Sequence, residues 1–131
     1  MKKDIEIPPV TGLSLAVAEE YNDAFQTLDH YVYLINDKDS DLETVLVVSS
    51  GKGDQQVTST MRHKIELLPA RSFARIELIQ EEVLRLQNLF RVSFFENSRL
   101  YEKNFVLEKG AWRQGALRHI RALGKRGILI K

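Results

Sequence analysis

The sequence contains no cysteine, so neither disulfide bonds nor thiolate chemistry can contribute to stability or function. It has no run of eighteen apolar residues, and we therefore expect no membrane-spanning helix. Its first ten residues, MKKDIEIPPV, lack the apolar run of a signal peptide. Repeats and low-complexity segments are also missing. These absences predict a cytoplasmic protein with no membrane association.

The composition is that of a globular chain. The 131 residues are 44% apolar and 28% charged, which fits one domain over residues 1–131. Residues 1–60 hold four Lys and Arg against eleven Asp and Glu, whereas residues 61–131 hold fifteen against seven. Either strands of both halves interleave and mix these charges, which we favour, or the molecule has an acidic and a basic side.

The strongest structural signal lies between Asn88 and Gly110, which contains four of the six phenylalanines. Two apolar runs flank the polar residues Glu96 to Arg99, a pattern that predicts a hairpin with a loop of about four residues. One face carries alternating apolar side chains on both arms: Phe90, Val92 and Phe94, then Tyr101, Phe105 and Leu107. So much aromatic surface needs further strands or a second sheet to cover it.

Several other segments alternate with the period of a β-strand. Strands are predicted from Leu13, over 30–35, 43–49, 57–67 and 74–79, and at 128–130. In the 57–67 segment we expect Met61 and Ile65 to be buried, and Arg62 and Lys64 to be exposed. In 30–35 and 43–49 both alternating sets are apolar, which is typical of strands covered on both faces.

The remaining segments predict turns and minor helix. Glu19 to Leu28 is expected to be a loop or a helical turn, and Ser49 to Asp54 a turn. Residues 81–87 are expected to form one or two helical turns. Leu117, Ile120 and Leu123, at a spacing of three, predict a short amphipathic helix over residues 111–123.

Seven or eight short strands, separated by turn-forming residues, predict an all-β fold. The expected architecture is an immunoglobulin-like antiparallel β-sandwich with minor helix. The cysteine-tryptophan-cysteine signature of immunoglobulins is absent, so the likeness concerns the layers only.

Five segments, VYLIND, ETVLVVSSG, STMRH, RIELIQEEV and KRGILIK, carry a family resemblance. The chain resembles a small family of uncharacterised single-domain bacterial proteins, some of which are labelled phenylalanyl-tRNA synthetase subunit. None of the segments contains a catalytic motif, so the resemblance implies a fold more than a function.

Motifs that carry chemistry fail on their spacing. Asp37 to Asp41 begins like a calcium loop, but Leu42 and Val48 stand where that loop requires glycine and glutamate. Ser49 to Gly53 lacks the spacing of a phosphate-binding loop. His63, on the apolar face of its strand, fits a partly buried histidine bonded to backbone better than a catalytic base. We predict no catalytic residue, no metal site and no cofactor.

The C-terminal segment 109–131 is basic and contains no acidic residue. Its candidate phosphate-binding residues are Lys109, Arg113, Arg118, Arg121, Lys125 and Arg126. The alternative is that these cations pair with the acidic N-terminal half and that Trp112 plugs the core. A sequence pI near 8.0 is lower than that of most nucleic-acid-binding domains.

Three functions follow, in order of preference. The first is a non-enzymatic binding or assembly module, with a protein partner or a second copy of the chain. The second is an accessory protein associated with RNA or tRNA through residues 109–131. An enzyme comes last because no catalytic constellation is visible. A homodimer is expected if the strand at Ile128–Ile130 is an open edge.

Overall fold

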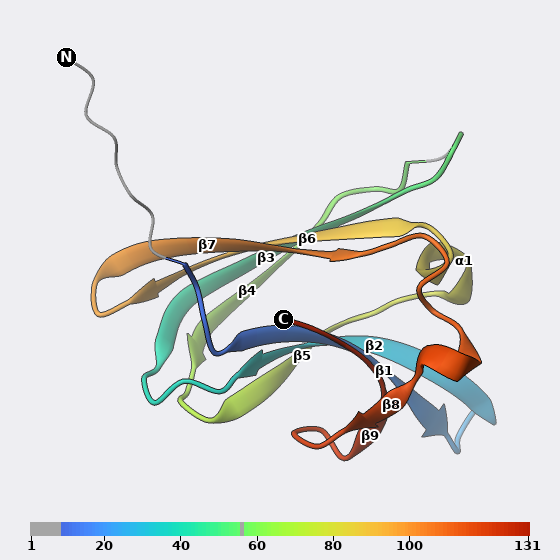
Figure 1. Ribbon diagram of the computed structural model, residues 1–131, viewed down its shortest axis with the longest axis horizontal. Coiled ribbons are helices and arrows are strands. Elements are labelled where there is room, and N and C mark those ends of the chain that lie inside the picture. The colour runs from blue at the N-terminus through green and yellow to red at the C-terminus, as the bar shows by residue number, and fades with distance from the viewer. Residues whose placement is uncertain (1–8, 56) are drawn as a thin grey trace.

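Two antiparallel sheets packed face to face form the molecule in the computed structural model, which describes residues 9–55 and 57–131 (Figure 1). The strands are β1 (Leu13–Asn22), β2 (Thr27–Asn36), β3 (Leu42–Lys52), β4 (Met61–Leu68), β5 (Ser72–Leu78), β6 (Gln87–Glu96), β7 (Arg99–Leu107), β8 (Arg118–Ile120) and β9 (Lys125–Ile130). The described residues thus form nine strands, against the seven or eight predicted. The all-β sandwich is confirmed. The signal-peptide expectation rests mainly on residues 1–8, which lie outside the described residues.

Each sheet contains strands from both halves of the chain. One sheet has the order β5-β2-β1-β9-β8 and the other β4-β3-β6-β7. The C-terminal β9 lies beside β1, with Ile128 opposite Val17. This interleaving confirms the favoured interpretation of the charge asymmetry. β1 also pairs with the 128–130 strand within the chain. The homodimer, expected if that strand is an open edge, stays a prediction.

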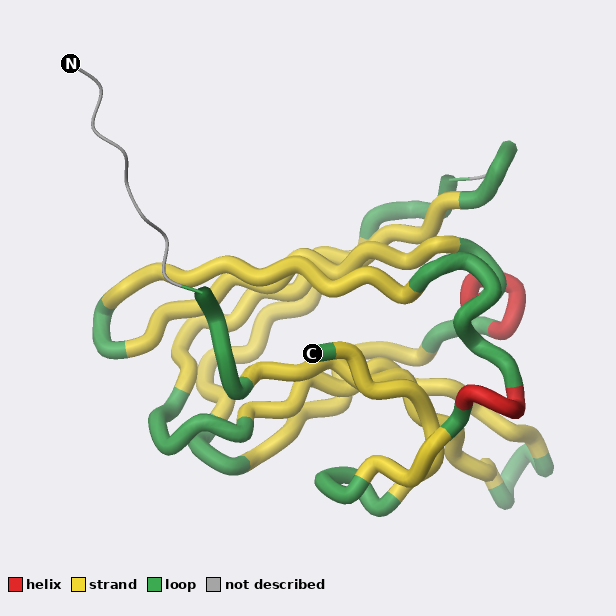
Figure 2. Tube along the Cα trace, viewed as in Figure 1, coloured by secondary structure: helices red, strands yellow, loops and turns green. Residues whose placement is uncertain are grey.

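Helical residues occur at one end of the sandwich (Figure 2). The four-residue helix α1 (Glu81–Leu84) connects β5 in one sheet to β6 in the other, where helical turns were predicted. The short 3-10 helix η1 (Gln114–Ala116) precedes β8. Neither of these helices in the described part of the chain is long and apolar enough to cross a membrane.

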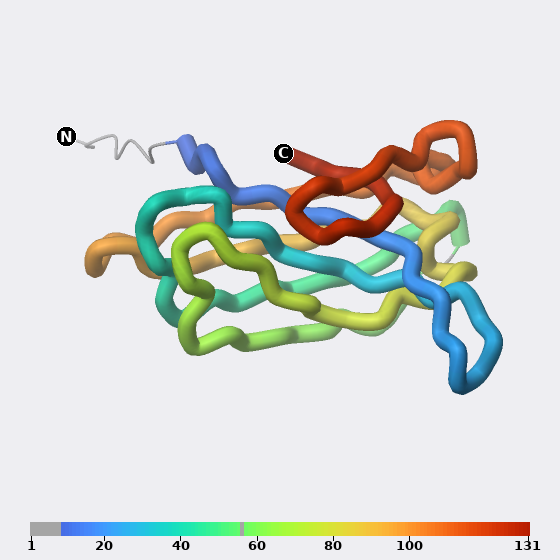
Figure 3. The backbone as a smooth tube through the Cα atoms, turned by 90° about the horizontal axis from the view of Figure 1, so that it is seen from below, coloured from blue at the N-terminus to red at the C-terminus, as the bar shows by residue number. Residues whose placement is uncertain are grey.

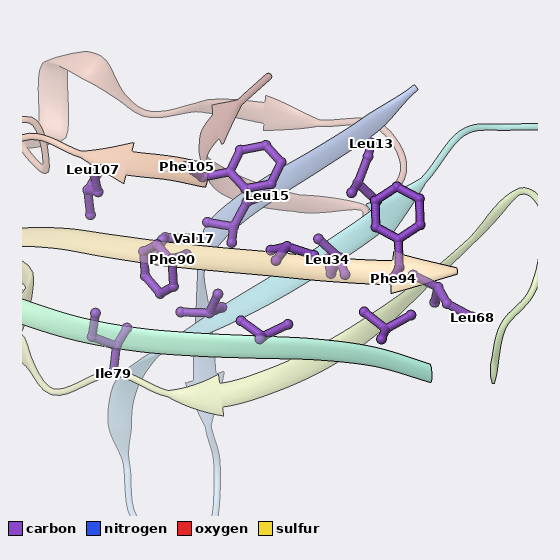
Figure 4. Close-up of a cluster of buried hydrophobic side chains, with 14 of the residues drawn as sticks. Leu13, Leu15, Val17, Leu34, Leu68, Ile79, Phe90, Phe94, Phe105 and Leu107 are labelled. Carbon is purple, nitrogen blue, oxygen red and sulfur yellow. The ribbon is translucent and has the colours of Figure 1, made fainter. Parts of the chain in front are cut away.

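The core lies between the two sheets and is built on the predicted hairpin. Phe90, Phe94 and Phe105 are at most 1% exposed, because alternation along β6 and β7 directs them all inward. Figure 4 shows Phe90 towards the same end of the core as Ile79, with Phe94 and Leu68 at the other end. The hairpin itself is confirmed.

The hairpin loop is shorter than the four residues expected. Glu96 pairs with Arg99, so only Asn97 and Ser98 form the loop. Both have positive φ angles, 52° and 63°, as the two central residues of a type I′ turn require. The twist of such a turn matches that of the flanking strands, which explains why pairing continues to the very end.

The prediction of a helix over residues 111–123 is wrong. This segment contains η1, β8 and a turn, and Ile120 packs on the outer face of the five-stranded sheet against Ala16 and Ala18. Ile120, from a short strand, and Leu123, from the turn that follows, both pack on that face, so two of the three residues spaced by three come together without a helix. Figure 3 shows the turn after β8 lying across the sheet.

Two predicted interruptions are shorter than expected. The loop predicted at Glu19 to Leu28 is confined to the turn at residues 23–26, because β1 and β2 stay paired until Asn22 meets Thr27. Ser49 to Asp54 is not a turn as a whole, because β6 pairs with β3 as far as Lys52. In both places a neighbouring strand overrides the local preference of polar residues and glycine.

The 57–67 prediction is only partly correct. β4 begins at Met61, and Val57 forms just an isolated bridge with Lys52. Ile65 is half-buried and Arg62 and Lys64 are exposed, as expected. Met61 is 48% exposed, because it lies at the end of β4 beside an open cleft.

Candidate functional site

A cleft of about 280 Å³ opens between the sheets near the ends of β3 and β5; we call it the β4–β5 cleft. It is lined by Ser49, Ser50, Gly51, Thr58, Ser59, Met61, Glu77, Leu78, Ile79, Gln80, Val83 and Asn88. β4 and β5 are edge strands of different sheets, so no backbone ladder closes this side of the sandwich. A concave site with an apolar floor and converging polar groups is the usual form of a small-molecule site.

A carboxylate from one sheet reaches the other sheet at this cleft. Glu77 Oε1 accepts a hydrogen bond from the Ser49 hydroxyl at 2.6 Å and lies 3.3 Å from His63 Nε2. In the β3–β4 ladder Val47 is opposite His63 and Ser49 is opposite Met61, so Ser49 and His63 are diagonal neighbours on the inner face. Strand register therefore places both groups against Glu77.

The wall of the cleft is held by hydrogen bonds between Gly51 and Thr58. Thr58 N donates to Gly51 O at 2.8 Å, and Gly51 N donates to Thr58 Oγ1 at 2.7 Å. A Cβ at Gly51 would lie 3.1 Å from Thr58 Cγ2 and 3.2 Å from Asn88 Oδ1. The absence of a side chain at Gly51 thus lets the 57–59 segment approach β3 closely.

The floor of the cleft is fixed by a buried amide. Asn88 Nδ2 donates to the carbonyl oxygens of Val83, at 2.8 Å, and Leu86, at 3.1 Å. These bonds hold the chain after α1 against the start of β6. Ile79 and Val83, both packed on the core, supply the apolar part of the floor.

A second inward-facing carboxylate, Glu96, lies at the opposite end of β6. Lys38 Nζ is 2.9 Å from Glu96 Oε1, and the Ser40 hydroxyl donates to Oε2. Burial raises the pKa of Glu96, but the hydrogen bonds from Ser40 and Lys38 and the charge of Lys38 outweigh it, so the pKa lies below its ordinary value. At this end of the sandwich the charge of the carboxylate is therefore compensated by Lys38.

The predicted basic segment does not form one free cationic surface. Lys109 pairs with Asp54 at 3.1 Å, Lys125 with Glu20 at 2.6 Å and Arg126 with Glu19 at 3.4 Å. Arg113 and Arg118 donate to nearby backbone carbonyl groups, and Arg121 is exposed in the turn after β8. Trp112 packs on the core and meets the His30 ring edge-on at 5.2 Å.

The pair between Glu20 and Lys125 belongs to a charged cluster on the outer face of the five-stranded sheet. Glu20 also lies 3.3 Å from Arg75, whose guanidinium stacks 4.3 Å from the Tyr31 ring centroid. The hydrogen bond to Glu20 raises the pKa of Lys125, and burial followed by the charge of Glu20 raises the pKa of Tyr33. These contacts join the two halves of the chain, so a role in holding the sheet together accounts for the charged cluster.

Of the three side chains that meet at Glu77 Oε1, the sequence identified only His63, which contacts Glu77 but does not itself line the cleft. His63 is partly buried as predicted, but its partner is a carboxylate and not the backbone. Ser49 and Glu77 were missed because they come from strands in different sheets, and no local motif links them. Among the described residues no three histidine or acidic side chains gather as a metal site.

No family model, curated protein or solved structure matches this chain. The function is therefore inferred from the geometry of the cleft alone.

Proposed function

We propose that this protein is a non-enzymatic binding module that holds a small molecule in the β4–β5 cleft. The observation that carries the proposal is Glu77, a carboxylate 13% exposed, placed between an apolar floor and a rim of hydroxyl groups. The volume of the cleft, about 280 Å³, lies just below that of most ligand pockets, which span roughly 300–1,000 Å³. A small ligand therefore suits it best.

Binding is favoured over catalysis by the order of the three polar groups. In serine hydrolases the histidine contacts the serine hydroxyl and the acid lies behind the histidine. Here Ser49 and His63 both face Glu77 Oε1, so the acid stands between the other two. The arrangement orients a carboxylate and does not activate a nucleophile.

We propose an immunoglobulin-like topology for the scaffold. The neighbours β1-β2-β5 and β4-β3-β6-β7 follow the order of the corresponding strands in the two immunoglobulin sheets. β9 and β8 extend the first sheet beyond β1. In this scheme the ligand cleft opens beside β4 and β5, edge strands of the two sheets.

RNA association through residues 109–131 is the second candidate function. It is supported by Arg113, Arg118 and Arg121, which have no carboxylate partner among the described residues. Three of the other four cations of the segment, Lys109, Lys125 and Arg126, are paired, which reduces the charge available for phosphate groups. We therefore rank this function below ligand binding.

A titration of the ¹⁵N-labelled protein with small aromatic amines, alcohols and carboxylic acids tests the leading proposal. Binding should shift the backbone amide signals of Gly51, Thr58 and Ile79 before those of the outer sheet faces. Ser59→Trp, at the rim of the cleft, should abolish these shifts. Thr60→Trp, its exposed neighbour outside the lining, should leave them. Shifts that Ser59→Trp does not affect would contradict the proposal.

A further inference from the structure

We propose that the ligand of the β4–β5 cleft is a small amphipathic cation, with an ammonium group bound to Glu77 and an apolar body on Ile79 and Val83. This inference rests on the proposed function and adds the chemical class of the ligand. It follows from three features of the cleft: a carboxylate without a permanent cation, the composition of the lining, and the free side of that carboxylate.

The first feature is seen by comparing two carboxylates of similar side-chain exposure. The Glu96 side chain is 11% exposed and the Glu77 side chain 13%. A carboxylate taken so far out of water is stable when a cation or several hydrogen-bond donors compensate its charge. Glu96 has Lys38, whereas Glu77 has no lysine or arginine partner within residues 9–55 and 57–131.

The partners that Glu77 does have leave its charge largely uncompensated. Ser49 donates a neutral hydrogen bond, and His63 carries a charge only when it is protonated. Both approach the same oxygen, Oε1, and no described residue donates a hydrogen bond to Oε2. Oε2 thus has no donor among the described residues, and Glu77 itself lines the cleft from which a ligand would enter.

The lining selects the rest of the ligand. Ile79 and Val83 form an apolar floor, and Leu78 and Met61, about half exposed, form the mouth. The residues that line the cleft include no lysine and no arginine. An anionic ligand would meet Glu77 without a compensating charge, and juxtaposed like charges repel each other. A neutral ligand would leave the charge of the Glu77 carboxylate uncompensated.

Calorimetric titration with three compounds of one shape tests this assignment: benzylamine, benzyl alcohol and benzoate. We expect benzylamine to bind about tenfold more tightly than benzyl alcohol, since a hydrogen bond to a charged group contributes more than a neutral one. Benzoate should bind most weakly. Glu77→Gln should remove the preference for benzylamine. Glu66→Gln, a carboxylate 80% exposed on the outer face of β4, should retain it.

Each outcome decides the proposal. Equal affinities for the three compounds, with binding still blocked by Ser59→Trp, would overturn the cationic ligand and leave the binding function intact. Benzylamine binding that survives Glu77→Gln would also overturn the assignment. No binding of any compound would overturn both proposals. The comparison of ligands needs no variant, so it decides the question even if Glu77→Gln does not fold.

Discussion

Glu77 Oε1 lies 2.6 Å from Ser49 Oγ, and this hydrogen bond joins the two sheets beside the β4–β5 cleft. We expect Ser49→Ala to lower the free energy of unfolding by about 1–2 kcal/mol, because it removes a donor from a partly buried carboxylate. Urea denaturation measures the change. Ser93→Ala, on the outer face of β6, removes a hydroxyl without a partner among the described residues and should be nearly neutral. Equal effects of the two variants would contradict a specific role for Ser49.

Gly127 on β9 is predicted to tolerate no side chain. A Cβ there would overlap the carbonyl oxygen of Val17 and lie 2.7 Å from the Cα of Ala18, so the backbone of β1 or β9 would have to move. Gly127→Ala should therefore reduce the free energy of unfolding by about 3 kcal/mol or more. Gly115→Ala, where no atom lies within 4 Å of the added carbon, is the matched control and should change stability by less than about 0.5 kcal/mol. Thermal unfolding of both variants provides the comparison.

The ion pair between Lys38 and Glu96 predicts a stability loss in acid. Because the folded-state pKa of Glu96 is lowered, its contribution is fully present above the ordinary value of 4.5 and is lost as the pH falls through the folded-state pKa. Glu96→Gln should therefore differ most from the wild type at neutral pH and converge with it in acid. Urea titrations across this range measure both curves. A constant difference at all pH values would contradict the ion pair.

The RNA hypothesis predicts a steep salt dependence. Affinity for single-stranded RNA should fall with a log–log slope of about −0.7 per phosphate contact. Arg118→Ala combined with Arg121→Ala should reduce that slope by about two contacts' worth, because neither arginine has a carboxylate partner among the described residues. Fluorescence anisotropy at several salt concentrations measures the slope. Absence of binding at low salt would remove this function.

The sequence predicted the layers because alternation is a local property. Phe90, Val92 and Phe94 point inward in any sheet that covers one face of the hairpin, whatever the rest of the chain does. The prediction for residues 111–123 was wrong because their apolar spacing suits a helix as well as a strand followed by a turn. Which one forms depends on Ala16 and Ala18, whose small side chains leave room on the outer face.

The candidate site was beyond prediction for a different reason. Ser49 and Glu77 meet only because β3 and β5 face each other from separate sheets, and their separation of 28 residues carries no motif. His63 was noticed for its chemistry, but its partner is set by the packing of one sheet on the other. That Glu77 lacks a cation is recognised only by comparison with Glu96, which is paired with Lys38.

A crystal structure of the protein soaked with benzylamine tests the central claim most directly. The account predicts the amine nitrogen within hydrogen-bond distance of Glu77, at about 2.7–2.9 Å, and the ring on Ile79 and Val83. A ring that lies outside the β4–β5 cleft, or an amine that turns away from Glu77 towards solvent, would contradict it.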